Sequence, residues 1–358
     1  MAFRLPDRLV LRRVAETVAI AAFGGAVLGL PGLPAGWLSG AIVAVAIAAV
    51  AGRPVTIPEG LAQFTFVITG ISLGGAVTPE SVANMGTWPL SMLALAIAMV
   101  GLTASVAFYL HKVHRWDTTS AVLGASPGGL ASVLVLAHEY GADVRSVAIV
   151  QTVRIVVLAV ILPGALTLLG LAGSPSAARA SASFLAQPGQ LLALIVICTI
   201  VAVVAQWVRF PGGLIFGAMT SSAVLHGSGL ITAGLPPWLA IISFVVLGAL
   251  TGTRFANTDA QLLRQLAGAA IGACVVGMLV ALGFAIATAN LLSLNTGDVI
   301  IAYAPGALEA MMILALALHF DPAFVGAHHL FRFMLVLVSI PIVIPWIAKK
   351  PAPPEPRT

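Results

Sequence analysis

Long apolar stretches alternate with short polar ones along the whole chain. A helix needs about 20 apolar residues to cross the hydrocarbon core of a membrane, so most of these stretches predict spanning helices. Two of them, 36–51 and 212–226, are short for a full crossing. The runs cover about 14–30, 36–51, 60–77, 88–110, 118–138 and 146–171 in the first half, and 189–208, 212–226, 237–253, 265–291, 296–318 and 323–348 in the second.

The two halves of the chain echo each other at a spacing of 178 residues. Pro127-Gly128 corresponds to Pro305-Gly306, and Arg154 corresponds to Arg332. Such coincidences at one spacing predict a duplicated unit. The expected organisation is a first membrane repeat at 1–172, a linker at 173–188, a second repeat at 189–348 and a cytoplasmic tail at 349–358.

The fifth run of each repeat contains Pro-Gly in its middle. Proline removes a backbone donor and glycine weakens a helix, so each of these runs should break into two half-helices. If the broken runs cross the membrane, the repeats are parallel, and Arg145, Arg209, Arg254 and Arg264 lie outside. If they re-enter, the second repeat is inverted and only Arg179 lies outside, as the positive-inside rule favours. We expect an all-α polytopic membrane protein with ten spanning helices, two re-entrant broken helices and both termini in the cytoplasm.

Composition excludes a water-soluble globular protein. Charged residues make up 8% of the chain, against about a quarter in soluble domains, and hydrophobic residues make up 60%. The net charge of +5 is scattered between apolar runs, so we expect no direct contact with nucleic acid. The two cysteines, Cys198 and Cys274, lie inside apolar runs and predict no disulfide framework.

The duplicated Pro-Gly break supplies the first candidate site, formed by Pro127, Gly128, Gly129, Pro305 and Gly306. Freed N–H groups at the start of a half-helix suit an anion or a polar substrate group. Secondary transporters place such broken helices near the membrane midplane. The alternative is a kink that only lets helices pack closely.

Arg154 and Arg332 lie well inside the sixth run of their repeats, where a lone cation costs several kcal/mol. Three roles remain open for them. They pair with Glu309 or with backbone carbonyls as structural links, extend to an interface, or face a substrate anion. Glu309 follows the second break by one turn, and its counterpart in the first repeat is Ala131.

Gln151, His328 and His329 precede the arginines by about one turn. Together with them they form a polar stripe that suits a cavity lining or a proton relay. The alternative is that the histidines lie near a helix end and are exposed to water. Asp143 and Asp321 are expected to cap the sixth helices.

Signals for an enzyme are poor. His111 and His114 lie beside Lys112 and Arg115 in what we expect to be a solvated loop, and the sequence contains no HExxH motif, cysteine cluster or phosphate-binding loop. We therefore expect neither catalysis nor a cofactor or metal.

The sequence resembles the AbrB family of bacterial integral membrane proteins, which are built from a duplicated unit and are often labelled ammonia monooxygenases. The residues that carry the resemblance are Leu33-Pro34-Ala35-Gly36, Pro127-Gly128-Gly129-Leu130 and Gly141-Ala142-Asp143-Val144, with their second-half echoes. Family members commonly carry an acid after both breaks, whereas this chain keeps Glu309 but has Ala131 and Ser132 in the first half. The resemblance implies a protein of the bacterial inner membrane.

These features predict a secondary transporter or exporter of a small polar or anionic solute. Pro127, Gly128, Gly129, Pro305 and Gly306 would open the helices, and Arg154 and Arg332 would hold the anion. Glu309, Gln151 or His329 would serve as polar or proton-coupling groups. The alternative is a membrane-embedded sensor that influences gene expression indirectly. The expected partners are the lipid bilayer, the solute and, in a homo-oligomer, further copies of the chain.

Overall fold

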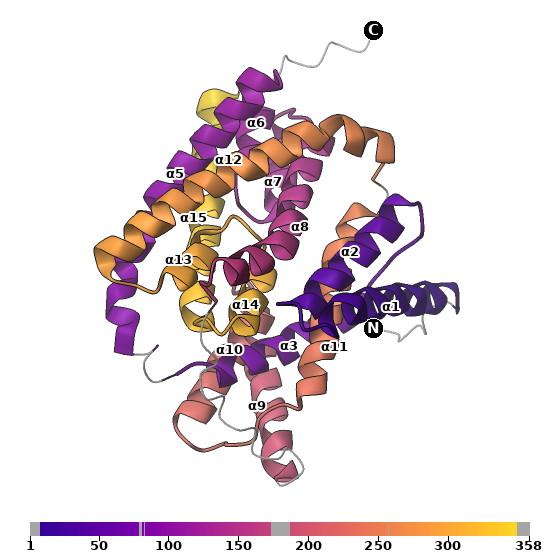
Figure 1. Cartoon of the computed structure of the whole chain (residues 1–358), viewed down its shortest axis with the longest axis vertical. Helices are drawn as coiled ribbons and strands as arrows, with labels where there is room; N and C mark the ends of the chain where they lie inside the picture. The colour runs from indigo at the N-terminus through magenta and orange to yellow at the C-terminus, as the bar shows by residue number, and fades with distance from the viewer. Residues whose placement is uncertain (1–7, 79–80, 82, 173–186, 257, 349–358) are drawn as a thin grey trace. The chain divides into compact units, whose positions relative to one another are not determined.

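The computed structural model describes residues 8–78, 81, 83–172, 187–256 and 258–348. These residues are mostly helical and include no β-strand (Figure 1). Most of the linker expected at 173–188, the tail at 349–358 and Arg179 lie outside the described residues. The long helices are α1 (Arg8–Gly29), α2 (Gly36–Val50), α3 (Glu59–Gly75), α5 (Trp88–Val113), α8 (Val144–Leu168), α9 (Pro188–Trp207), α10 (Gly213–Gly227), α11 (Pro237–Gly252), α12 (Ala260–Leu292) and α15 (Pro322–Ile347).

The remaining helical elements are short. Two 3₁₀ turns, η1 (Asn84–Thr87) and η2 (Thr253–Phe255), adjoin α5 and α11. Each expected broken run is two half-helices: α6 (Thr118–Ala125) with α7 (Leu130–Glu139), and α13 (Thr296–Tyr303) with α14 (Leu308–Ala317). The breaks therefore lie where the Pro-Gly pairs predict them.

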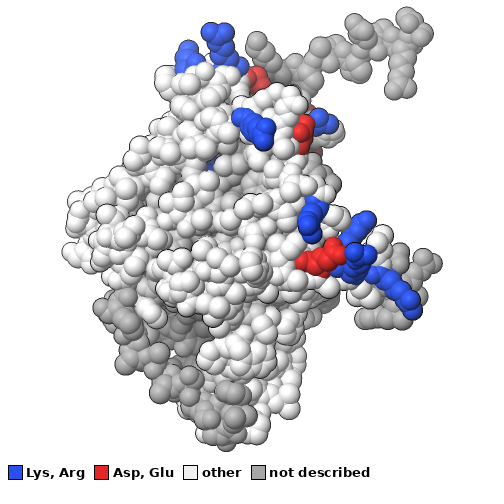
Figure 2. Space-filling view, turned by 45° about the vertical axis from the view of Figure 1, so that its right-hand side comes forward, with Lys and Arg blue, Asp and Glu red and all other residues white. Residues whose placement is uncertain are grey.

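Length and composition make this a polytopic membrane protein. Among the described residues, six helical stretches are long and apolar enough to span: Asn84–Val113, α8, α9, Pro237–Phe255, α12 and α15. Many of their exposed positions carry large apolar side chains; on α5, for example, Leu93, Val100 and Phe108 are each at least 60% exposed. Figure 2 shows a surface that is mainly uncharged, with Lys, Arg, Asp and Glu gathered in a few places. The finer count of ten spanning helices stays a prediction.

The chain forms two compact units, each assembled from segments of both halves. The first comprises Met1–Gly86, Leu158–Ala260 and Ala307–Gly326, and the second comprises Thr87–Val157, Gln261–Gly306 and Ala327–Thr358. The first unit therefore contains α1, α2, α3, α9, α10, α11 and α14, and the second contains α5, α6, α7, α12 and α13, while α8 and α15 contribute to both.

Glycines set the helix packing of the first unit. A Cβ atom on Gly70 of α3 would lie 2.5 Å from the carbonyl oxygen of Ile215 on α10. A Cβ atom on Gly248 of α11 would lie 2.7 Å from the carbonyl oxygen of Leu38 on α2. Small residues let helix backbones approach this closely, which is how membrane helices gain packing energy. The two crossings use residues 177 or 178 positions apart in the sequence.

The second unit has its own apolar core around the first broken helix. Its buried members come from α6, α7, α8 and α15, with Ala142 just before α8; they are Leu123, Val133, Ala137, Ala142, Val147, Val336, Ile340 and Ile344. In the same unit, Gly277 of α12 faces Val106 of α5, so the two long helices pack side by side (Figure 1).

We predict that Gly40→Ala destabilises the protein, because α1 and α2 cross there at backbone contact. A Cβ atom on Gly40 would overlap the carbonyl oxygen of Gly24. Overpacking of this kind costs about 1–3 kcal/mol. Thermal unfolding of the detergent-purified chain should show a lower Tm.

The control for Gly40→Ala is Gly60→Ala, in the exposed first turn of α3, where an added Cβ meets nothing within 4 Å. Alanine there should leave the Tm unchanged or raise it, since it favours the helix. Equal melting of the two variants would contradict the packing argument.

Candidate functional site: two broken helices and their buried arginines

The first half-helices begin with side-chain caps. The Asp117 carboxylate accepts a hydrogen bond from the Ser120 N–H at 2.9 Å, and the Asn295 side-chain oxygen accepts one from the Gly297 N–H at 2.9 Å. The second half-helices, α7 and α14, begin after Gly129 and Ala307 without any side-chain cap. Their first N–H groups are therefore available to another partner.

Arg154 on α8 bonds to the end of α6. Its side chain is 4% exposed, and its Nη1 and Nη2 atoms donate to the carbonyl oxygens of Ala125 and Ser126 at 3.2 and 3.4 Å. These carbonyls belong to the last residue of α6 and its C-cap. A guanidinium at this position supplies hydrogen bonds that the break removes, and it lies at the negative end of the helix dipole.

Arg332 on α15 does the same at the second break. It is also 4% exposed, and its Nη1 and Nη2 atoms donate to the carbonyl oxygens of Ala304 and Gly306 at 2.5 and 2.6 Å. Extension of the arginines to an interface is therefore wrong. Of the structural partners considered from the sequence, the described residues provide the backbone carbonyls and not Glu309.

Gln151 and His329 add a second hydrogen bond to each first half-helix. Gln151 Nε2 donates to the Leu123 carbonyl oxygen at 2.8 Å, and His329 Nε2 lies 3.0 Å from the Ile301 carbonyl oxygen. A carbonyl only accepts, so His329 Nε2 carries the proton. His328 and His329 are fully buried, so the expectation that they are exposed to water is wrong.

Several buried polar atoms of this cluster have no protein partner among the described residues. They are Gln151 Oε1, Arg154 Nε, His329 Nδ1 and Arg332 Nε. Two N–H donors without a protein partner in the described part of the chain, each with an acceptor on the same helix, suit a small anion or a hydrogen-bonding solute.

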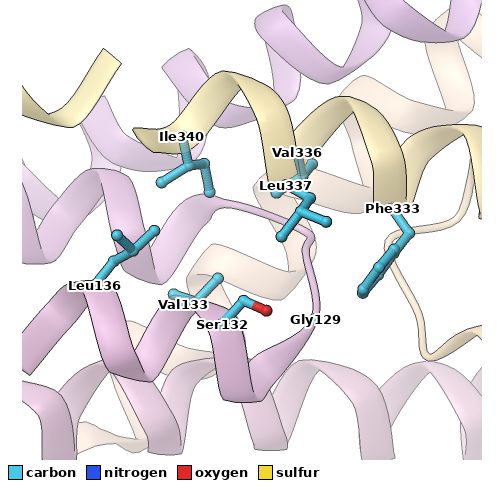
Figure 3. Close-up of a pocket in the computed structure, with 8 residues that line it drawn as sticks. All are labelled: Gly129, Ser132, Val133, Leu136, Phe333, Val336, Leu337 and Ile340. Atoms are coloured by element: carbon cyan, nitrogen blue, oxygen red, sulfur yellow. The ribbon is translucent and has the colours of Figure 1, made fainter. Parts of the chain in front are cut away.

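Glycines at the first break permit close approach to α15. A Cβ atom on Gly128 would lie 2.5 Å from Val336 Cγ1, and one on Gly129 would lie 2.6 Å from Phe333 Cε2. Next to this contact is a hollow with about 250 Å³ of empty space between α7 and α15 (Figure 3). Its lining is apolar apart from the Ser132 hydroxyl: Gly129, Ser132, Val133, Leu136, Phe333, Val336, Leu337 and Ile340.

A second polar network was not anticipated from the sequence. The Tyr303 hydroxyl donates to the carbonyl oxygen of Ser91 at 2.5 Å, and the Ser91 hydroxyl lies 2.6 Å from His328 Nε2. Tyr303 is fully buried and ends α13, directly before the second break. Its position in an apolar run, beside the Pro-Gly pair, was the available signal.

The structure brings most of the predicted site residues into one unit. Glu309 is the exception, because it lies in the first turn of α14 in the other unit. Asp143 and Asp321 are helix caps, as expected: Asp143 accepts from the Ser146 N–H at 3.2 Å, and Asp321 accepts from the Ala323 N–H at 2.9 Å. The residues within the second unit are Pro127, Gly128, Gly129, Gln151, Arg154, Pro305, Gly306, His329 and Arg332.

The fold and this cluster define a polytopic α-helical protein with two interrupted helices, each bonded to a buried arginine. The chain belongs to the AbrB family: the model for that family, described as "Transition state regulatory protein AbrB", matches residues 37–348. It is 26% identical over 324 residues to the Escherichia coli (strain K12) protein named "Putative regulator AbrB", covering 88% of this chain and 91% of that protein. It is 24% identical over 349 residues to "Uncharacterized protein YhjN" of Bacillus subtilis (strain 168), covering 90% of each.

We predict that Arg154→Met lowers stability by about 1–3 kcal/mol, because it leaves the Ala125 carbonyl without a donor and the Ser126 carbonyl with the Gly128 N–H alone. Arg145→Met is the control, since Arg145 is exposed on the same helix. Thermal unfolding in detergent should separate the two variants. If Arg154→Met and the control have the same Tm, the hydrogen bonds of Arg154 do not stabilise the fold.

Gln151 and His329 make equivalent hydrogen bonds at the two breaks, so glutamine should be able to replace histidine at position 329. His329→Gln should change the free energy of unfolding by no more than about 0.5 kcal/mol, since an amide N–H replaces the ring N–H that donates to the Ile301 carbonyl. His329→Leu should cost about 1–3 kcal/mol, because a buried carbonyl loses its donor. If His329→Gln and His329→Leu have the same Tm, the hydrogen bond from His329 to the Ile301 carbonyl does not contribute to stability.

Proposed function

We propose that this AbrB-family protein is a secondary transporter or exporter of a small polar or anionic solute. Its place would be the bacterial inner membrane, with both termini in the cytoplasm. The protein would act without a cofactor or an enzymatic step. The observation that carries the proposal is the pair of buried arginines at the two helix breaks, whose Nε–H groups have no partner among the described residues.

A duplicated, inverted architecture is part of this proposal. Equivalent residues recur in equivalent contacts: Gly70 with Gly248, and Arg154 with Arg332. The half-helices α6 and α13 also begin and end 178 residues apart. Under the proposal, ten helices span the membrane and each broken helix re-enters, from the cytoplasm in the first repeat and from outside in the second. Transporters with inverted repeats place substrate at such breaks.

Each group would have a distinct task. The helices would be kept open by Pro127, Gly128, Gly129, Pro305 and Gly306. The glycines, which have no side chain, leave room for the backbone to approach α15 or the solute. Arg154 and Arg332 hold the broken ends with their Nη atoms and offer Nε–H to the solute. Gln151 and His329 offer acceptors beside them, since Gln151 Oε1 and His329 Nδ1 are free of protein partners among the described residues. Proton coupling, if the transporter uses it, would involve His329 or Glu309.

A membrane-embedded regulator is the second candidate. The observations that favour it are the family description and the name of the Escherichia coli relative, both of which refer to regulation. Such a protein would bind a ligand at the same residues and affect gene expression through a partner, without moving the ligand.

Solute binding tests the shared part of these proposals. A ligand that binds the folded state raises its Tm by mass action. We expect at least one small carboxylate or other polar solute to raise the Tm of the detergent-purified chain, and Arg154→Lys and Arg332→Lys to reduce that increase. The lysine variants keep a cation but lose the Nε–H.

The control for solute binding is Arg145→Lys, which should respond as the wild type does. An undiminished response in both lysine variants would exclude the arginines as ligands. With a ligand identified, flux into proteoliposomes separates transport from sensing.

A further inference from the structure

A second hollow lies within the first unit, apart from the arginine cluster. Its empty space of about 290 Å³ includes the open region at its mouth. The residues that line it come from α2, α3, α11, η2 and α14: Leu38, Phe66, Leu247, Leu250, Thr251, Arg254, Glu309 and Ala310.

The lining contains one cation and one anion that do not bond to each other. Glu309 lies in the first turn of α14 and Arg254 lies in η2, and both are half-buried. Among the described residues, neither side chain has a hydrogen bond or an ion pair. A charged side chain in an apolar half-helix such as α14 is costly unless it has a partner, and a charge kept at such a cost is a mark of function.

The other half of the chain lacks both charges. The positions 178 residues before Arg254 and Glu309 are occupied by Ala76 and Ala131. Ala131 lies in α7, the counterpart of α14, so Glu309 is not required for that half-helix to form, and Ala76 directly follows α3, the counterpart of α11. The presence of both charges in one half and of neither in the other fits a cation and an anion that act as a pair.

The rest of the lining favours a ligand with an apolar part. Leu38 and Leu247 are buried, and Phe66 and Leu250 are half-buried beside them. The Thr251 hydroxyl donates to the Leu247 carbonyl oxygen at 2.9 Å, so its oxygen still has lone pairs for a donor on the ligand.

We propose that this hollow binds a zwitterionic solute of the amino-acid class with an aliphatic side chain. The Glu309 carboxylate would accept from the ligand ammonium, and the Arg254 guanidinium would donate to the ligand carboxylate through its planar fork. The leucine and phenylalanine side chains would contact the aliphatic part. This inference goes beyond the proposed function, because it assigns a site outside the arginine cluster and concerns binding whether or not the solute is transported.

Isosteric ligands test the requirement for both charges. Leucine, 4-methylpentanoate, which lacks the ammonium, and isoamylamine, which lacks the carboxylate, are titrated into the full detergent-purified chain. Binding is measured by calorimetry and by Tm, with glycine, alanine and phenylalanine to map the side chain. We expect leucine to bind at least tenfold more tightly than either single-charge analogue.

Two variants place the binding in the hollow. Glu309→Gln and Arg254→Gln should each weaken leucine binding at least tenfold, while the ligand-free Tm stays at the wild-type value because neither side chain has a protein partner among the described residues. Glu59→Gln and Arg53→Gln, both exposed in the same unit, are controls that should bind as the wild type does.

Three results would overturn the assignment: no binding by any amino acid in the panel, equal binding of a single-charge analogue, or unchanged affinity in both hollow variants. Transport of another solute together with any of these results would leave the proposed function intact. Leucine binding by a chain that moves no solute into proteoliposomes would leave the assignment of the hollow intact and contradict the proposed function.

Discussion

A break in a membrane helix exposes backbone carbonyls where no lipid group can bond to them, and this constraint governs the structure around α6 and α13. Each unpaired backbone group costs several kcal/mol in hydrocarbon. Arg154 and Arg332 supply the missing donors, two hydrogen bonds to each broken end. Their burial follows, because a guanidinium that bonds to a break inside the protein has to lie inside it. Gln151 and His329, about one turn before the arginines, bond in the same way to carbonyls further inside the first half-helices.

Both halves provide side-chain donors to the backbone carbonyls at the break, but the side chains differ between the halves. Glutamine at one break and histidine at the other make the same bond to a carbonyl, but only histidine can change its protonation state. Glu309 and Arg254 have alanine counterparts. The two halves therefore share the hydrogen bonds from arginine to the broken ends, whereas the polar side chains around those bonds differ between the halves.

Periodicity and composition predicted most of the fold, because apolar runs and Pro-Gly pairs act locally. The breaks at Pro127 and Pro305 and the caps at Asp143 and Asp321 lie where the sequence indicated. The sequence offered backbone carbonyls as one of several partners for the arginines but could not choose among them, because hydrogen bonds to carbonyls 26 to 29 residues away depend on tertiary packing. Burial of His328 and His329 was missed for the same reason: nearness to a helix end says nothing about what covers that end. The hollow with Glu309 and Arg254 joins five elements, and no local pattern marks it.

The most direct measurement of the central proposal, that the two broken helices re-enter the membrane from opposite faces, is cysteine labelling. Leu130 at the start of α7 and its counterpart Leu308 at the start of α14, both half-buried, would each be replaced by cysteine in a Cys198→Ala/Cys274→Ala background. A membrane-impermeant maleimide would be applied to membrane vesicles of known orientation. The account predicts labelling of Leu130→Cys from the cytoplasmic face and of Leu308→Cys from the opposite face. Labelling of both from the same face, or of neither, would contradict it.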